Sequence, residues 1–195
     1  MKRAAFRAVL IAAMLALFSP GAWACVGKTL NVGVLNSVEG QLFAEMLSTL
    51  INERTGTTVK VSYYKDEQDL YGAIEAKKVD ISIENTARAM QVLRRPADAD
   101  ARRAFEEVKA AYEQRMGLVW LRPFGFLRGG GSAPSYTAAV LRMEVVNNFP
   151  ALPRVINKLG EAINDATYTR LIRSVQSGEA PKTVARDFLR SKKII

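Results

Sequence analysis

The feature that most constrains the fold is an alternation of strand and helix patterns over residues 30–83. The first strand is a short apolar run, LNVGVL, and the second alternates and is rich in β-branched residues. Between them, apolar side chains recur every three or four positions until Thr55-Gly56 ends the helix. The predicted strands cover residues 30–35, 57–64 and 79–83, and the predicted helices residues 39–55 and 66–77. Strands and helices in this order, joined by short connections, predict a parallel sheet with crossover helices.

The second half of the chain predicts two more strands and then mostly helices. The expected elements are a helix over 100–116, strands over 118–121 and 136–142, and helices near 144–149, 153–163, 167–176 and 181–191. Between the two strands, Gly, Ser and Pro are concentrated in RGGGSAPS, residues 128–135, which is typical of a connector. The prediction is therefore an α/β fold with a mostly parallel five-stranded sheet, helices on both faces and a helical C-terminal segment.

The N-terminus has the pattern of a secretory signal sequence over residues 1–24. Lys2, Arg3 and Arg7 precede an apolar stretch over residues 8–18, and Ala22-Trp23-Ala24 matches a signal peptidase site. The apolar stretch is too short to span a bilayer as a helix. We expect an exported, periplasmic protein whose mature form, residues 25–195, is one domain.

Cys25, the only cysteine, would be the first residue after the cut. A lone cysteine forms no intrachain disulfide, but at this position it is a candidate for lipidation. Ala22-Trp23-Ala24 matches a lipoprotein signal poorly, so lipid anchoring and plain export both stay open. A lipid on Cys25 would be the only membrane attachment.

Composition argues against several classes of function. Removing the signal sequence takes away three of the nine net positive charges and leaves +6, with no Lys/Arg cluster or RNA-binding motif that would indicate nucleic acid. The chain has no histidine and no phosphate-binding loop, so no metal or cofactor is expected. Glu39, Asp80 and Glu84 could form a hydrolytic carboxylate pair near strand ends, an alternative that only coordinates can test. We therefore expect that the protein is not an enzyme.

Two loops qualify as a binding site. In an open α/β sheet, ligands bind beyond the carboxyl ends of the strands, where residues 36–40 and 84–87 would lie. The helix that starts near Glu39 would point its N-terminal amides into that crevice. The alternative is that Asn36, Ser37 and Thr86 only cap helices.

Several segments resemble substrate-binding proteins of glycine betaine/osmoprotectant ABC importers. These are LNVGVLNSVEGQLFAEML (30–47), VDISIENTA (79–87), GLVWLRPFGF (117–126) and residues 136–195, in the family's order. The resemblance implies a type II periplasmic binding protein-like fold. It also implies a small polar or quaternary-ammonium solute as ligand and an ABC permease as partner.

The departures from the family pattern are equally informative. Family members close two lobes over the ligand, and the second lobe lies between the segments that match 117–126 and 136–195; here only residues 127–135 separate them. The resemblance therefore implies a single lobe in which 127–135 is a short linker. The family's ligand-side aromatic residues fall at Ser37, Ser82 and Asn85, while Trp120 is expected in the core.

Together these observations predict an extracytoplasmic solute-binding-type component of a glycine betaine-class ABC importer, with ligand binding weakened or altered by the loss of a lobe. The candidate ligand-binding residues are Asn36, Ser37, Glu39, Glu84, Asn85 and Thr86. The alternative function is a periplasmic interaction module whose open cleft docks a protein or a second copy of the chain.

Overall fold

The structure is a computed structural model that describes residues 29–129 and 132–195. The proposed signal sequence and Cys25 lie outside the described residues. The strands are β1 (Thr29–Leu35), β2 (Thr58–Tyr64), β3 (Ile81–Asn85), β4 (Leu118–Trp120), β5 (Gly125–Gly129) and β6 (Ser132–Arg142). The helices are α2 (Val38–Thr55), α3 (Glu67–Glu75), α4 (Thr86–Val92), α5 (Ala101–Met116), α6 (Met143–Asn148), α7 (Leu152–Ala162), α8 (Asp165–Gln176) and α9 (Pro181–Ser191).

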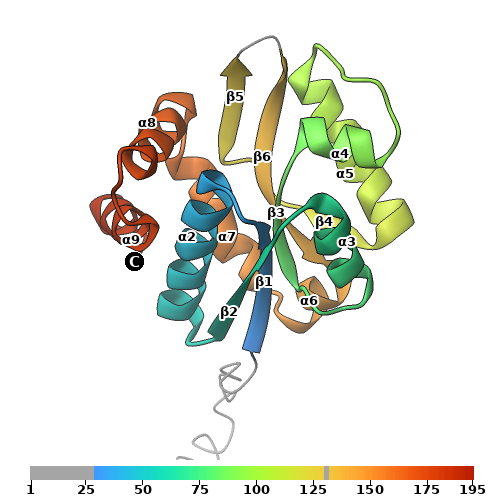
Figure 1. Ribbon diagram of the computed structural model, residues 1–195. Coiled ribbons are helices and arrows are strands. Elements are labelled where there is room, and N and C mark those ends of the chain that lie inside the picture. Colours follow the sequence, from blue (N-terminus) through green and yellow to red (C-terminus); the bar gives the residue numbers. More distant parts are fainter. Residues whose placement is uncertain (1–28, 130–131) are drawn as a thin grey trace, which may run out of the picture.

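The α/β prediction is confirmed, with a sheet that runs β2-β1-β3-β6-β4 and β5 attached to β6 (Figure 1). Strand β1 pairs in parallel with β2 and β3, as the alternating sequence pattern predicts. Strand β6 pairs antiparallel with β3, β4 and β5, so the expectation of a mostly parallel sheet is wrong. The reason is that only two residues separate β5 from β6 in the sequence, so β6 runs back along β5, whereas parallel neighbours need a crossover.

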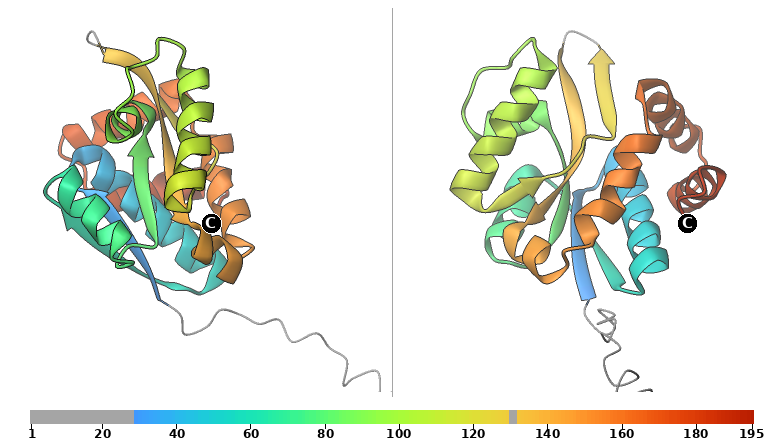
Figure 2. Two further views of the ribbon diagram at one scale, coloured as in Figure 1. Left: turned by 90° about the vertical axis from the view of Figure 1, so that its right-hand side faces the viewer. Right: turned by 180° about the vertical axis from the view of Figure 1, so that it is seen from behind.

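Helices cover both faces of the sheet, which makes three layers (Figures 1 and 2). On one face, α2, α7, α8 and α9 pack against side chains such as Val32, Ile83 and Leu141. On the other face, α3, α4 and α5 pack against Ala138 and Val140. Alternate residues of each strand thus enter different cores, as a period of two requires.

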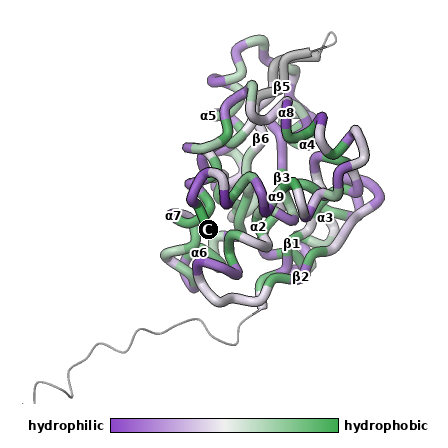
Figure 3. Tube along the Cα trace, turned by 90° about the vertical axis from the view of Figure 1, so that its left-hand side faces the viewer, coloured by the Kyte–Doolittle hydropathy of each residue, from purple (hydrophilic) through white to green (hydrophobic). Residues whose placement is uncertain are grey.

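Helix ends follow local sequence signals. Gly56 and Gly117 end α2 and α5 with positive φ angles of 68° and 63°, a backbone conformation that suits glycine. The surface helices alternate between hydrophobic and hydrophilic residues (Figure 3), and in α9 the buried residues are Val184, Ala185, Phe188 and Leu189. Across the described part of the chain, no helix combines the length and apolarity needed to span a membrane.

The stretch expected to be a linker belongs mostly to a β-hairpin. Residues 127–129 are the end of β5, and residues 132–135 are the start of β6. Leu127 lies opposite Ser135, and Gly129 lies opposite Ser132. Glycine and serine obscured the strand pattern here, because both are depleted in strands relative to β-branched residues.

Candidate functional site

The predicted site residues lie at the carboxyl ends of β1 and β3, where α2 and α4 begin. Ser37 is the N-cap of α2, and its Oγ accepts a hydrogen bond from the Gly40 amide at 3.0 Å. Asn36 precedes it and accepts a hydrogen bond from the Gln41 side chain at 2.9 Å. Both Asn36 and Ser37 are exposed, so they are the predicted residues that are most open to solvent.

Glu39, in the first turn of α2, is held by two hydroxyl groups from distant parts of the chain. Thr137 Oγ1 on β6 donates to Glu39 Oε1 at 2.8 Å, and the Tyr168 hydroxyl on α8 donates to the same oxygen at 2.6 Å. The Tyr168 ring stacks on Phe43 with centroids 5.5 Å apart and lies directly against Gly125. Glu39 therefore joins α2, β6 and α8.

Glu84, near the end of β3, is the centre of a second polar cluster. Its side chain is 3% exposed and accepts hydrogen bonds from the Tyr71 hydroxyl and from Arg88 Nε. The Tyr71 hydroxyl also lies 2.5 Å from that of Tyr112, on α5. Arg88 is four residues after Glu84 and donates a further hydrogen bond to the Ile83 carbonyl at 3.3 Å. The cluster ties α3, α4 and α5 to the sheet.

Burial dominates the electrostatics of both clusters. It raises the pKa of Glu84, while the charge of Arg88 opposes the rise. It also raises the pKa values of Tyr71, Tyr112 and Tyr168 well above the usual range for tyrosine, and a neighbouring carboxylate adds to each shift. These tyrosines are therefore protonated donors at neutral pH.

Asn85 and Thr86 fix α4 to β6. Asn85 is the N-cap of α4, and its Oδ1 accepts from the Arg88 amide at 2.9 Å. Thr86 is 1% exposed, and its Oγ1 accepts from the Tyr136 amide at 3.0 Å. Ser135 Oγ in turn accepts from the amide of Ala87 at 3.1 Å. Of the three residues in the capping alternative, Ser37 caps a helix, whereas Asn36 bonds the Gln41 side chain and Thr86 bonds across to a strand.

The predicted carboxylates take part in two hydrogen-bonded clusters, although Glu39 is near enough for its charge to raise the pKa of Arg88. Glu39 contacts elements on the α2 face of the sheet, and Glu84 contacts elements on the α3 face. Asp80 precedes β3, so the expectation that it lies near a carboxyl end is wrong. It bonds the Asn31 amide at 2.8 Å and Arg142 at 2.5 Å. A hydrolytic pair among these three carboxylates has no support in this geometry.

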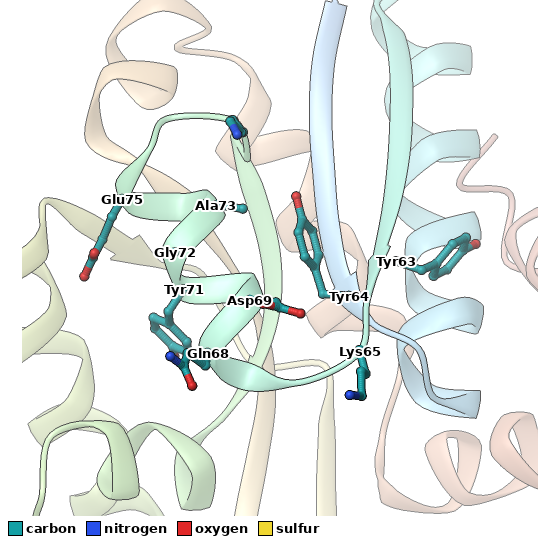
Figure 4. A pocket seen from close by; sticks show the side chains of 10 residues that line it. Tyr63, Tyr64, Lys65, Gln68, Asp69, Tyr71, Gly72, Ala73 and Glu75 are labelled. Atoms are coloured by element: carbon teal, nitrogen blue, oxygen red, sulfur yellow. The ribbon is translucent and has the colours of Figure 1, made fainter.

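A large depression in the surface lies away from the predicted site. A depression of about 1010 Å³ separates α3 from the end of β2 (Figure 4), and Tyr64, Lys65, Asp69 and Gly72 are among the residues that line it. None of the six predicted ligand-binding residues lines it. Trp120 and Phe124 are 2% and 0% exposed and belong to the core, as expected for Trp120. Within residues 29–129 and 132–195, no group of His, Cys, Asp and Glu could hold a metal ion.

Sequence reasoning missed four residues that hold the predicted carboxylates: Tyr71, Arg88, Thr137 and Tyr168. None of the four had a local signal: even Arg88, four residues after Glu84, lies in α4, whereas Glu84 lies in strand β3, so the two are not a pair on one helix. Thr137 and Tyr168 reach Glu39 across 98 and 129 residues of sequence, a separation that no local pattern indicates.

By its layers, strand order and strand-end loops, the molecule has the type II periplasmic binding protein-like fold. The crystal structure of a glycine betaine/carnitine/choline ABC transporter is similar, with a TM-score of 0.76 and 13% sequence identity over 86% of this chain and 98% of that chain. The structure of apo YehZ from Escherichia coli is similar with a TM-score of 0.76 and 14% sequence identity, over 87% of this chain and 100% of that chain. Lactococcal OpuAC in its closed form with glycine betaine is similar with a TM-score of 0.52 and 7% sequence identity, over 85% of this chain and 96% of that chain.

The sequence itself identifies the family. Residues 28–131 match the family of the substrate-binding domain of ABC-type glycine betaine transport systems, OpuAC, and the chain belongs to this family. It is thus a solute-binding component of the ABC importer class, whose members are extracytoplasmic and non-catalytic. No curated protein sequence matches the chain.

Proposed function

We propose that the protein is a periplasmic solute-binding component of a glycine betaine-class ABC importer in which a single lobe remains. The observation that carries the proposal is the β5–β6 hairpin. Residues 127–129 pair directly with residues 132–135, at the point where the family resemblance places the second lobe. The family match also ends at residue 131, between the end of β5 and the start of β6 in the sequence.

A single lobe explains why the remaining site would bind glycine betaine weakly or not at all. Small-molecule sites usually bury 70–90% of the ligand surface, which requires an opposing wall. Cation–π contacts need exposed aromatic faces, and Trp120 and Phe124 lie in the core. The carboxylates of Glu39 and Glu84 already have donors within the chain. Asn36 and Ser37 also bond within the chain, but they are exposed, so they are the predicted residues most open to a solute.

Calorimetry on the mature chain, residues 25–195, tests the proposal. We expect no affinity for glycine betaine in the micromolar range or tighter, and a thermal-shift panel should also include choline, carnitine, proline and common anions. A ligand at 100 times its dissociation constant adds about 2.7 kcal/mol of stability, which such a panel detects. Micromolar or tighter binding by the monomeric protein would contradict the single-lobe interpretation.

A binding solute can be located with matched variants. If any solute binds at the strand-end loops, Asn36→Ala should weaken the binding. Ser177→Ala, at an exposed site after α8, is the control that should leave it unchanged. Cell fractionation and mass spectrometry of the N-terminus would show whether the mature chain is periplasmic and whether Cys25 carries lipid.

The second candidate function is an interaction module that docks another protein on the strand-end face. The intrachain hydrogen bonds of Glu84, Asn85 and Thr86 favour this function. They occupy polar groups that a solute would need, and they hold this face in a fixed conformation. Binding of a permease or other periplasmic protein that is lost in Asn36→Arg, with no solute bound by the mature chain, would favour this function.

A further inference from the structure

Strand β2 forms an edge of the sheet, because no described strand pairs with its outer side. It is the terminal strand in the order β2-β1-β3-β6-β4, and it pairs with β1 without interruption over all seven residues, Thr58–Tyr64. It contains no proline and no bulge, two of the features that commonly protect an edge strand, although it carries the charged Lys60. Its outer side is therefore a regular row of backbone donors and acceptors.

The residues that face outward can be assigned. The Tyr64 carbonyl accepts a hydrogen bond from the Asn36 amide, so the backbone groups of Tyr64 point toward β1. Because backbone groups alternate along a strand, those of Val59, Val61 and Tyr63 point away from β1. Tyr63 is 47% exposed and is the exposed large hydrophobic residue of the described chain. Figure 4 shows its ring on the opposite side of β2 from Tyr64.

We propose that the outer edge of β2 pairs antiparallel with β2 of a second copy, so that the sheet continues across a two-fold axis at Val61. In this register Val61 lies opposite itself and Val59 lies opposite Tyr63, which forms about six backbone hydrogen bonds between the copies. The Val59–Tyr63 contact is an aromatic–β-branched pair, a favourable combination across strands.

Charge selects this register and this occupant. On the other face of the strand, Lys60 lies opposite Ser62 of the second copy, so no like charges meet. A register centred on Lys60 would place two lysines opposite each other, which is destabilising. A register centred on Ser62 would move Val59 beyond the end of the partner strand. The sequence of β2, TVKVSYY, is thus complementary to itself around Val61.

Light scattering after size-exclusion chromatography of the mature chain tests the pairing. We expect a dimer whose dissociation constant rises at least about tenfold in Val61→Pro, because two N–H donors are lost at the two-fold axis. Proline leaves the bonds to β1 intact, since the Val61 amide faces outward. Val61→Thr keeps the donor and similar volume and should remain dimeric. Circular dichroism checks that each variant folds, and Tyr63→Lys is a second disruptive variant.

Cross-linking tests the register in a Cys25→Ser background. Val61→Cys should form an intermolecular disulfide, because hydrogen-bonded partners lie about 5.5 Å apart at Cα. Ser62→Cys should not, since the two copies of that position would be diagonal neighbours at about 7–8 Å. A monomer at high micromolar concentration would overturn the proposal. A dimer that Val61→Pro and Tyr63→Lys leave unchanged, or that cross-links through Ser62→Cys instead, would overturn it equally.

Discussion

Removing Arg88 should expose how strongly the buried Glu84 depends on its partner. The side chains of Glu84 and Arg88 are 3% and 15% exposed, so Arg88→Met leaves a carboxylate in the interior with a tyrosine hydroxyl and one amide as donors. Breaking a buried ion pair in this way typically costs about 3–5 kcal/mol of unfolding free energy. Urea unfolding followed by circular dichroism at pH 7 measures the loss.

The loss should also depend on pH with a defined sign. Burial raises the pKa of Glu84, and loss of Arg88 removes the charge that opposes the rise. A carboxyl group whose pKa is raised on folding contributes stability below its unfolded value of about 4.3, and this contribution is lost as the pH rises. The penalty of Arg88→Met should therefore be smaller at pH 4.5 than at pH 7.

Two further variants separate this mechanism from a general loss of packing. Glu84→Leu combined with Arg88→Met removes both charges and should recover at least half of the loss. Glu161→Gln breaks the exposed pair with Arg122 and should change stability by less than about 1 kcal/mol. The reasoning would be refuted by an Arg88→Met penalty below about 1 kcal/mol, or by one that is the same at both pH values.

Three other predictions concern the frame around the site. Gly125→Ala would place a methyl group 2.2 Å from the Tyr168 ring and should lower the unfolding free energy by about 1–3 kcal/mol. Gly72→Ala, in a helix with open space around the glycine, should instead raise it by about 0.5–1 kcal/mol. The midpoints of urea unfolding compare the two variants. Ser135→Ala leaves an amide at the start of α4 without its acceptor and should cost about 1–2 kcal/mol by the same assay, and equal stability would contradict the assigned bond. Folding raises the pKa of the three buried tyrosines Tyr71, Tyr112 and Tyr168, so above pH 10 the folded state keeps protons that the unfolded chain releases. The unfolding free energy should therefore fall above pH 10 by up to about 1.4 kcal/mol per pH unit for each tyrosine. Tyr168→Phe should make this slope shallower by about a third.

Local sequence patterns predicted the N-terminal strands and most helices because each pattern is complete within a few turns. The run at residues 30–35 and the Gly56 stop lie within one residue of the observed ends of β1 and α2. Helix α4 was missed because Thr86–Val92 is too short to show a helical period. The antiparallel placement of β6 was missed because pairing partners are not encoded in the pattern of a single strand.

The candidate site was predictable in position but not in connectivity. The carboxyl-end rule placed the loops around Asn36 and Asn85 correctly, at the starts of α2 and α4. The rule says nothing about which face of the sheet each carboxylate occupies. Glu39 and Glu84 belong to different hydrogen-bonded clusters, and their hydroxyl donors come from α8, β6 and α3. Such partners follow from the tertiary fold alone.

The central place of β6 has a consequence for how the molecule can assemble. Strands β3 and β4 do not pair with each other, and β6 alone connects them. A truncated chain that stops at residue 129 would thus leave β3, β4 and β5 without their β6 partner and a split interior, with neither half able to cover its apolar side chains. Because β6 spans residues 132–142, the native sheet can close only after two thirds of the polypeptide has been made.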